Sequence, residues 1–210
     1  MAGPQRFEQD GVRGWLHEPA REPCAALAIT HGAGSNCEAP LLIAVADAFT
    51  AKGYAVLRYD LPFRQARPNG PPTGSQARDR EGIGRAAQAL RALAPGVPIY
   101  LGGHSYGGRQ TSMLAAEDDR VADALLLLSY PLHPPAQPEK LRTEHFPLLK
   151  LPTLFVHGTK DEFGTQGELE IARLLIPAHT VLQAVEKAGH GLSPKIAVQI
   201  AEWFVTFTSK

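Results

Sequence analysis

A Gly-X-Ser-X-Gly pentapeptide occupies residues 103–107, where an apolar run meets a helical pattern. This strand–turn–helix context is typical of a nucleophile elbow, which holds its central serine, here Ser105, at the apex of a sharp turn. The flanking glycines suit a strained backbone in which a Cβ would collide. The turn also aims the first N–H groups of a helix at the serine, where they can stabilise negative charge. The pattern therefore predicts a serine nucleophile.

The pentapeptide alone is a short motif in a chain with 20 glycines among 210 residues, so a glycine-rich turn with an idle serine is the alternative. A serine hydroxyl needs a base to become a good nucleophile, and the base needs an orienting acid. Along chains that carry this elbow, the acid and then the base follow the serine. Both belong on loops after later strands, because the carboxyl ends of parallel strands share one edge of the sheet.

Two loops meet this requirement. Asp161 follows the apolar run 154–157, and His190, between two glycines, follows the last strand that we expect, 180–185. We therefore expect Asp161 to be the acid and His190 the base, with Glu162 as the alternative acid. A turn-forming aspartate and a structural histidine are the competing interpretations, and the correct chain order of all three residues weighs against them.

Acyl transfer also requires donors for a developing oxyanion. The apolar run 24–30 ends in His-Gly-Ala-Gly-Ser, residues 31–35. One donor is expected to be the backbone N–H of Tyr106, directly after the nucleophile, and the other to come from this loop. We predict the N–H of Ala33 as the second donor, with Gly32 lining the substrate pocket.

The order of elements predicts an α/β fold. Short apolar runs alternate with helical patterns, which favours a mostly parallel central sheet with helices on both faces. The expected strands are 7–9, 12–16, 24–30, 54–59, 97–101, 124–128, 153–157 and 180–185, the first two forming a hairpin around Asp10-Gly11. The expected helices are 40–52, 79–93, 107–117, 166–175 and 194–208. We expect Gly53 to end the first helix, Asp79 to cap the second, and 61–77 to be a loop.

Composition limits the function classes. The chain has 21 basic and 21 acidic residues, which gives no electrostatic reason to expect nucleic acid or a membrane as partner. Cys24 and Cys37 form no disulfide framework, and no apolar run is long enough for a signal peptide or a transmembrane span. We expect a single domain over residues 1–210, in the cytoplasm, and leave the oligomeric state open.

No cofactor is expected. His31, His104 and His157 fall on one expected edge of the sheet, but no carboxylate motif for a metal accompanies them. The pair Gly82-Ile-Gly84 lies inside a helical pattern and lacks the preceding strand of a nucleotide-binding fingerprint. We therefore predict neither a metal site nor a nucleotide site.

Other loop residues have weaker assignments. Tyr130 and His133 follow the strand expected at 124–128, and we expect them to line the substrate pocket. Asp60 also ends a strand, where we expect it to bind loop backbone. Four arginines bracket the loop 61–77, and we interpret them as solvated charges rather than as a site for an acidic substrate: Arg64, Arg67, Arg78 and Arg80.

The assembled motifs resemble the α/β-hydrolase superfamily, from about residue 10 to the C-terminus. The motifs that carry the resemblance are 31–34, 103–107, 158–161 and 189–190. The segments 129–135 and 138–145 are similar to a compact, lidless branch related to dienelactone hydrolases, which includes the testis-expressed and histone-acetyltransferase-associated hydrolase-like proteins. Dienelactone hydrolases carry cysteine at the elbow where this chain has Ser105, so the resemblance does not imply lactone hydrolysis.

These observations predict a serine hydrolase of carboxylic esters or thioesters with small to medium acyl groups, acting on small molecules. The stretch 130–152 is too short for a full helical cap, so the crevice is expected to be open. Two alternatives remain. One is a non-catalytic binding or scaffold module of the same fold, and the other is an acyltransferase or haloperoxidase-like activity on the same triad.

Overall fold

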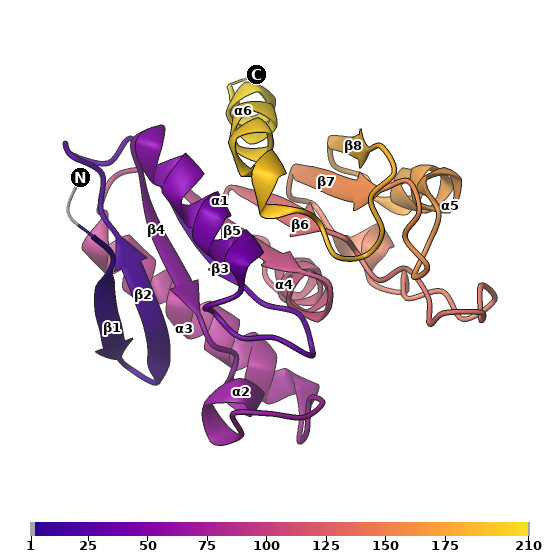
Figure 1. Ribbon diagram of the computed structural model, residues 1–210, viewed down its shortest axis with the longest axis horizontal. Helices are drawn as coiled ribbons and strands as arrows, with labels where there is room; N and C mark the ends of the chain where they lie inside the picture. Colours follow the sequence, from indigo (N-terminus) through magenta and orange to yellow (C-terminus); the bar gives the residue numbers. More distant parts are fainter. Residues whose placement is uncertain (1–2, 210) are drawn as a thin grey trace.

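The computed structural model describes residues 3–209, and its strands form one eight-stranded sheet in the order β1-β2-β4-β3-β5-β6-β7-β8 (Figure 1). The strands are β1 (Gln5–Gln9), β2 (Val12–His17), β3 (Ala25–Thr30), β4 (Tyr54–Tyr59), β5 (Ile99–His104), β6 (Ala124–Leu128), β7 (Thr153–Gly158) and β8 (Thr180–Val185). β2 pairs antiparallel with β1 and β4, and every other pairing is parallel. The expected mostly parallel sheet is confirmed.

The leading hairpin is built on Asp10-Gly11, as expected. Gln9 pairs with Val12, which leaves only these two residues in the turn. Asp10 has φ +52° and Gly11 has φ +73°. Both central residues thus have the positive φ that matches the right-handed twist of paired strands.

Helices cover both faces of the sheet (Figure 1). α1 (Pro40–Ala51) and α6 (Ala197–Thr208) bury Phe49 and Phe204 against one face. α3 (Gln76–Leu93), α4 (Tyr106–Glu117) and α5 (Gln166–Ala172) pack on the other face, where Ile83 and Leu169 are fully buried. The central strands are therefore covered on both sides, which explains why their sequences are continuous apolar runs.

The expected helix cap Asp79 is wrong. Ser75 caps α3 instead, and its hydroxyl accepts a hydrogen bond from the Ala77 N–H at 3.2 Å. Asp79 lies in the first turn of the helix and is buried. Its carboxylate accepts from the Tyr106 hydroxyl at 2.7 Å and from the Phe63 N–H at 3.1 Å. The carboxylate therefore ties the helix to residues beside the active-site edge rather than to its own N-terminus.

Several boundaries differ from the expected ones by a few residues. The expected loop 61–77 contains a short helix, α2 (Pro62–Ala66), which starts with proline at its first position. Two expected helices are divided by 3₁₀ turns, η2 (Arg173–Leu175) after α5 and η3 (Pro194–Ile196) before α6. α1 ends at Ala51, and Gly53 follows with φ +91°, as a helix-ending glycine should.

No cap domain covers the sheet in the part of the chain that the structure describes. The stretch between β6 and β7 contains one short 3₁₀ turn, η1 (Phe146–Leu148), and no other helix or strand. Among residues 3–209, no helix combines the length and the apolar character needed to cross a bilayer. The carboxyl ends of β3, β5, β7 and β8 are thus free to hold a site at one edge.

Candidate active site

Ser105 stands alone between β5 and α4, with φ +51° and ψ −117°. This left-handed backbone is uncommon for a residue with a side chain and marks local strain. A Cβ on Gly103 would lie 2.5 Å from the Gly107 carbonyl carbon, and a Cβ on Gly107 would lie 2.5 Å from the His31 carbonyl oxygen. Both flanking glycines are therefore required by close backbone packing, and the turn has the form of a nucleophile elbow.

The structure brings Ser105, His190 and Asp161 into one hydrogen-bonded chain. Ser105 Oγ lies 2.7 Å from His190 Nε2, and His190 Nδ1 lies 2.9 and 3.0 Å from the two carboxylate oxygens of Asp161. A carboxylate only accepts hydrogen bonds, so Nδ1 carries the imidazole proton and Nε2 accepts from the serine hydroxyl. This tautomer is the one that can take the serine proton.

Asp161 is held in place from its own loop. Its side chain is buried, and Oδ1 accepts from the Phe163 N–H at 2.9 Å. The Asp161 N–H donates to the Gly158 carbonyl at 3.2 Å. Glu162, the alternative acid, is exposed and makes no hydrogen bond with His190 among residues 3–209. The geometry thus favours Asp161 over Glu162 as the partner of His190.

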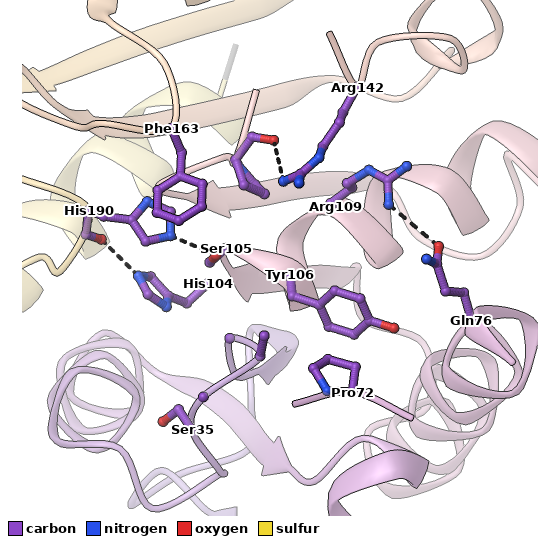
Figure 2. Close-up of a pocket in the computed structure, with 14 residues that line it drawn as sticks. Ser35, Pro72, Gln76, His104, Ser105, Tyr106, Arg109, Arg142, Phe163 and His190 are labelled. Atoms are coloured by element: carbon purple, nitrogen blue, oxygen red, sulfur yellow. Dashed lines mark hydrogen bonds between the residues drawn. The ribbon is translucent and has the colours of Figure 1, made fainter. Parts of the chain in front are cut away.

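Two aromatic neighbours fix the ring and backbone of His190. His104 Nε2 donates to the His190 carbonyl at 3.1 Å, and burial lowers the pKa of His104, so this ring stays neutral. The ring of Phe163 packs against the His190 imidazole, with 4.2 Å between ring centroids. Figure 2 shows both rings around His190 at the pocket.

The loop after β3 forms a turn beside the serine. The Ser35 N–H donates to the Gly32 carbonyl at 3.1 Å, with Ala33 inside the turn. Within the described residues, the Ala33 N–H has no hydrogen-bond acceptor. Tyr106 is the first residue of α4, so its N–H has no partner inside the helix either. Both residues line the same pocket as Ser105, which is the arrangement expected of oxyanion donors.

His31 fixes the start of this loop. Its Nδ1 donates to the Gly32 carbonyl at 2.8 Å, and its Nε2 accepts from the Leu61 N–H at 3.1 Å. Burial lowers the pKa of His31 to about 4, so the ring is neutral at neutral pH. Likewise, His157 Nε2 donates to the Gly164 carbonyl at 2.7 Å. These histidines bind backbone groups rather than facing one another.

Arg64 is a buried clamp, and its interpretation as a solvated charge is wrong. Its side chain donates to the carbonyls of Ser35 at 2.7 Å and Ala33 at 2.8 Å, and to those of Gly70 at 3.0 Å and Arg67 at 3.2 Å. Arg64 therefore links two segments: the loop after β3, which contains Ala33, and the segment that follows α2. The fork of guanidinium donors makes this possible, since it offers several N–H groups in one plane.

Asp60 binds loop backbone, as expected. Its Oδ1 accepts from the Cys37 N–H at 2.8 Å, and its Oδ2 accepts from Arg13 at 3.1 Å. Burial, together with the nearby Asp60 carboxylate, raises the pKa of the Cys37 thiol to about 12. Cys37 is therefore an inert packed residue rather than a second nucleophile.

A cavity of about 750 Å³ opens beside Ser105 (Figure 2). Its lining comes from the elbow and α4, from the loops after β3, β6, β7 and β8, and from the α2–α3 connection with the start of α3. The lining residues are Gly32, Ala33, Gly34, Ser35, Pro72, Gln76, His104, Ser105, Tyr106, Arg109, Pro131, Arg142, Phe163 and His190. This volume is within the range of pockets that bind small molecules. The expected lining residue Gly32 is among them.

The other two expected lining residues, Tyr130 and His133, are not part of this lining. Tyr130 is fully buried, and its hydroxyl donates to the Arg142 carbonyl at 2.6 Å. His133 is buried too, with Nδ1 2.8 Å from the Pro134 carbonyl and Nε2 3.6 Å from Glu168. Their loop turns both side chains into the fold, while Pro131 faces the pocket.

Sequence reasoning missed the two arginines of the lining, Arg109 and Arg142. Arg109 follows Ser105 by four residues, and residues so spaced share a helix face. That spacing was a usable signal for Arg109. Arg142 lies in an irregular loop, where no periodicity relates it to the serine.

Comparison with known proteins agrees with this architecture. Est1E from Butyrivibrio proteoclasticus superposes with a TM-score of 0.78 over 100% of both chains, at 20% identity. The dienelactone hydrolase from Anabaena variabilis ATCC 29413 gives 0.74 over 97% of this chain and 98% of that one, at 21% identity. XC6422 from Xanthomonas campestris, an α/β serine hydrolase without a lid, gives 0.70 over 99% and 93%, at 14% identity.

These structures share the fold, and a family model covers most of the chain. The model of the alpha/beta hydrolase domain matches residues 23–202, a span that includes Ser105, Asp161 and His190. The resemblance inferred from the motifs is therefore confirmed. The chain belongs to the alpha/beta hydrolase domain family.

Proposed function

We propose that this hydrolase cleaves carboxylic esters or thioesters of small molecules, with Ser105 as nucleophile, His190 as base and Asp161 as orienting acid. The observation that carries the proposal is the continuous hydrogen-bonded chain from Ser105 through His190 to Asp161 at the wall of a cavity of about 750 Å³. A nucleophile, a base and an orienting acid in hydrogen-bond reach are the requirements for nucleophilic acyl transfer.

The reaction would proceed in two halves. Ser105 Oγ attacks the carbonyl carbon while His190 Nε2 takes the hydroxyl proton, and the N–H groups of Ala33 and Tyr106 bind the oxyanion. His190 then gives the proton to the leaving alcohol or thiol, which departs and leaves an acyl-serine. In the second half His190 takes a proton from water, and the hydroxide attacks the acyl carbon. The tetrahedral adduct collapses to the free acid, and Ser105 recovers its proton from His190.

Esters and thioesters are favoured over amides because alkoxide and thiolate are better leaving groups than an amine. The absence of a cap domain over the described sheet supports access from solvent for modest acyl groups.

Hydrolysis of p-nitrophenyl acetate and p-nitrophenyl butyrate tests the proposal. We expect Ser105→Ala and His190→Ala to lower kcat by about 10³-fold or more, and Asp161→Asn by a comparable factor through the wrong imidazole tautomer. Ser209→Ala, at an exposed serine at the end of α6, is the control and should retain wild-type turnover.

The alternatives have distinct outcomes. Full activity in His190→Ala would contradict the assigned base. No turnover of any ester or thioester by the wild type would favour the binding-module alternative. An alkyl ester formed from added alcohol, or oxidation supported by added peroxide, would identify an acyltransferase or a haloperoxidase-like enzyme on the same triad.

A further inference from the structure

The active-site pocket has a cationic wall without a counter-ion in its lining. Arg109 and Arg142 are two of its lining residues, and that lining contains no aspartate or glutamate. Neither arginine has a carboxylate oxygen within 4.0 Å among residues 3–209. Arg80, by contrast, pairs with Glu117 at 2.9 Å.

The helix that follows the elbow, α4, fixes the backbone position of Arg109. Its N–H donates to the Ser105 carbonyl at 2.9 Å, so its backbone lies one turn beyond the nucleophile. Its side chain makes one hydrogen bond within the described chain, from Nη1 to the Gln76 amide oxygen at 3.4 Å (Figure 2). The Nε of Arg109 is buried and has no partner among these residues. Most of the five N–H donors of the Arg109 side chain therefore have no hydrogen-bond partner among these residues.

Hydrogen bonds within the loop between β6 and β7 fix the backbone position of Arg142. Its N–H donates to the Leu132 carbonyl at 2.8 Å, and its own carbonyl accepts from the buried Tyr130 hydroxyl at 2.6 Å. Its guanidinium makes one long hydrogen bond, 3.4 Å, to the Pro131 carbonyl (Figure 2). The backbone is thus fixed on both sides, while the charged group is left to face the pocket.

The positive charges of Arg109 and Arg142 repel each other. Burial lowers the pKa of Arg142, and the nearby Arg109 lowers it further, while Tyr130 and Glu144 act in the opposite direction. A half-buried charge without an ion pair costs free energy that a bound anion would recover. Guanidinium forks also match the two oxygens of a carboxylate or the several oxygens of a phosphate.

We infer that Arg109 and Arg142 bind an anionic group of the substrate, a carboxylate or a phosphate, while Ser105 attacks the ester carbonyl. This inference rests on the proposed esterase function. It narrows the substrate class to esters or thioesters that carry a negative charge a short chain away from the scissile bond.

Two pairs of esters, each with one anionic and one neutral member that share the same scissile ester, test this inference. The first pair is p-nitrophenyl hydrogen glutarate and its methyl-capped diester, which places a carboxylate on the acyl side. The second is 4-acetoxyphenyl phosphate and 4-methoxyphenyl acetate, which places a phosphate on the alcohol side. We expect kcat/KM to favour the anionic member of one pair by about 10- to 100-fold, the usual worth of charge-assisted hydrogen bonds. The pair that shows the preference identifies the source of the anion.

Variants assign the preference to the two arginines. Arg109→Gln and Arg142→Gln should each lower the anionic-to-neutral ratio about tenfold, and Arg142→Lys should keep an intermediate ratio because it keeps the charge without the fork. Arg120→Gln removes an exposed arginine outside the pocket lining and should leave the ratio unchanged. Each variant is compared by thermal unfolding with the wild type, so that a folding defect is recognised.

Binding to the inactive Ser105→Ala protein provides a readout that needs no turnover. Calorimetry with glutarate, and separately with inorganic phosphate, should detect binding of one of them that Ser105→Ala/Arg142→Gln weakens at least tenfold. Equal kcat/KM for both members of both pairs, with the neutral esters hydrolysed, would overturn the inference and leave the proposed function intact. No hydrolysis of any ester would remove the proposed function, and absence of both glutarate and phosphate binding would then overturn the inference as well.

Discussion

Arg64 holds the loop that carries the candidate oxyanion donor Ala33 but is not part of the lining of the pocket beside Ser105. It binds the carbonyls of Ala33 and Ser35, and so fixes the peptide groups around the Ala33 N–H that we propose as an oxyanion donor. A displaced N–H donor stabilises the oxyanion much less, because this stabilisation depends on preorganised geometry. Arg64 would thus support oxyanion stabilisation indirectly, because its guanidinium group binds backbone carbonyl oxygens of the loop.

Arg64→Met is expected to lower kcat on p-nitrophenyl acetate by about 10- to 100-fold with a smaller change in KM, because it frees the Ala33 peptide while leaving the pocket volume similar. Steady-state kinetics measure this split. Arg67→Met, at an exposed neighbour whose side chain makes no such bonds, is the matched control. Equal kcat in wild type and Arg64→Met would show that the clamp has no catalytic value.

The hydrogen-bonded chain of Ser105, His190 and Asp161 could be predicted because the order of these residues and their loops restrict the choice. Asp161 and His190 each lie on a loop after a strand, β7 or β8, that ends at the same edge of the sheet as the strand before Ser105. Arg142 and Phe163 could not be predicted, because their contacts depend on the path of irregular loops. The error at Tyr130 has the same origin, since this side chain, two residues after β6, turns into the core rather than into the pocket.

At the scale of elements, the elbow depends on how closely β5, α4 and the loop after β3 approach. Gly107 meets the His31 carbonyl, and Gly103 meets the backbone of Gly107 and Gly108, so three segments touch through backbone atoms. Such contacts leave no room for relaxation by side-chain rotation. Gly84 inside α3, by contrast, faces open space.

Gly107→Ala and Gly84→Ala are therefore expected to change stability in opposite directions. The first should lower the free energy of unfolding by about 2 kcal/mol or more through steric overlap. The second should raise it by about 0.5–1 kcal/mol through helix propensity. Urea unfolding followed by circular dichroism measures both, and a Gly107→Ala protein as stable as the wild type would contradict close backbone packing at Gly107.

The existence of the helices and strands could be predicted from apolar periodicity, but their ends could not always be. Ser75 and Asp79 are both acceptable caps by residue type. Asp79 is not the cap because its buried carboxylate binds Tyr106 and Phe63, two residues that are distant from it in sequence. Tertiary contacts of this kind are invisible to local sequence rules.

For the whole molecule, two histidines whose pKa values are lowered by burial couple stability to pH: His31, which is fully buried, and His145, which is partly buried. Burial lowers the pKa values of His31 and His145 from the ordinary 6.5 to about 4. The unfolded chain therefore binds protons near pH 6.5 that the folded chain accepts only near pH 4. Their contribution is complete above pH 6.5 and is lost as the pH falls toward 4, with an upper limit of about 3 kcal/mol for each residue.

His145→Gln should therefore reduce the fall in Tm between pH 7 and pH 4.5, relative to the wild type at the same two pH values. The variant keeps a polar group near Ser112, whose hydroxyl lies 2.8 Å from His145 Nε2. Differential scanning calorimetry measures the two slopes. Identical slopes would show that His145 gains its proton equally well in the folded and unfolded states.

Covalent labelling shows whether Ser105 is an activated nucleophile. A fluorophosphonate reacts with a serine only when a base and an oxyanion site activate it, and tryptic mass spectrometry locates the adduct. We predict one adduct on the peptide that contains Ser105, no adduct there in Ser105→Ala, and labelling slowed at least about 100-fold in His190→Ala. No adduct on the wild type, or equal labelling of wild type and Ser105→Ala, would show that Ser105 is not the activated nucleophile.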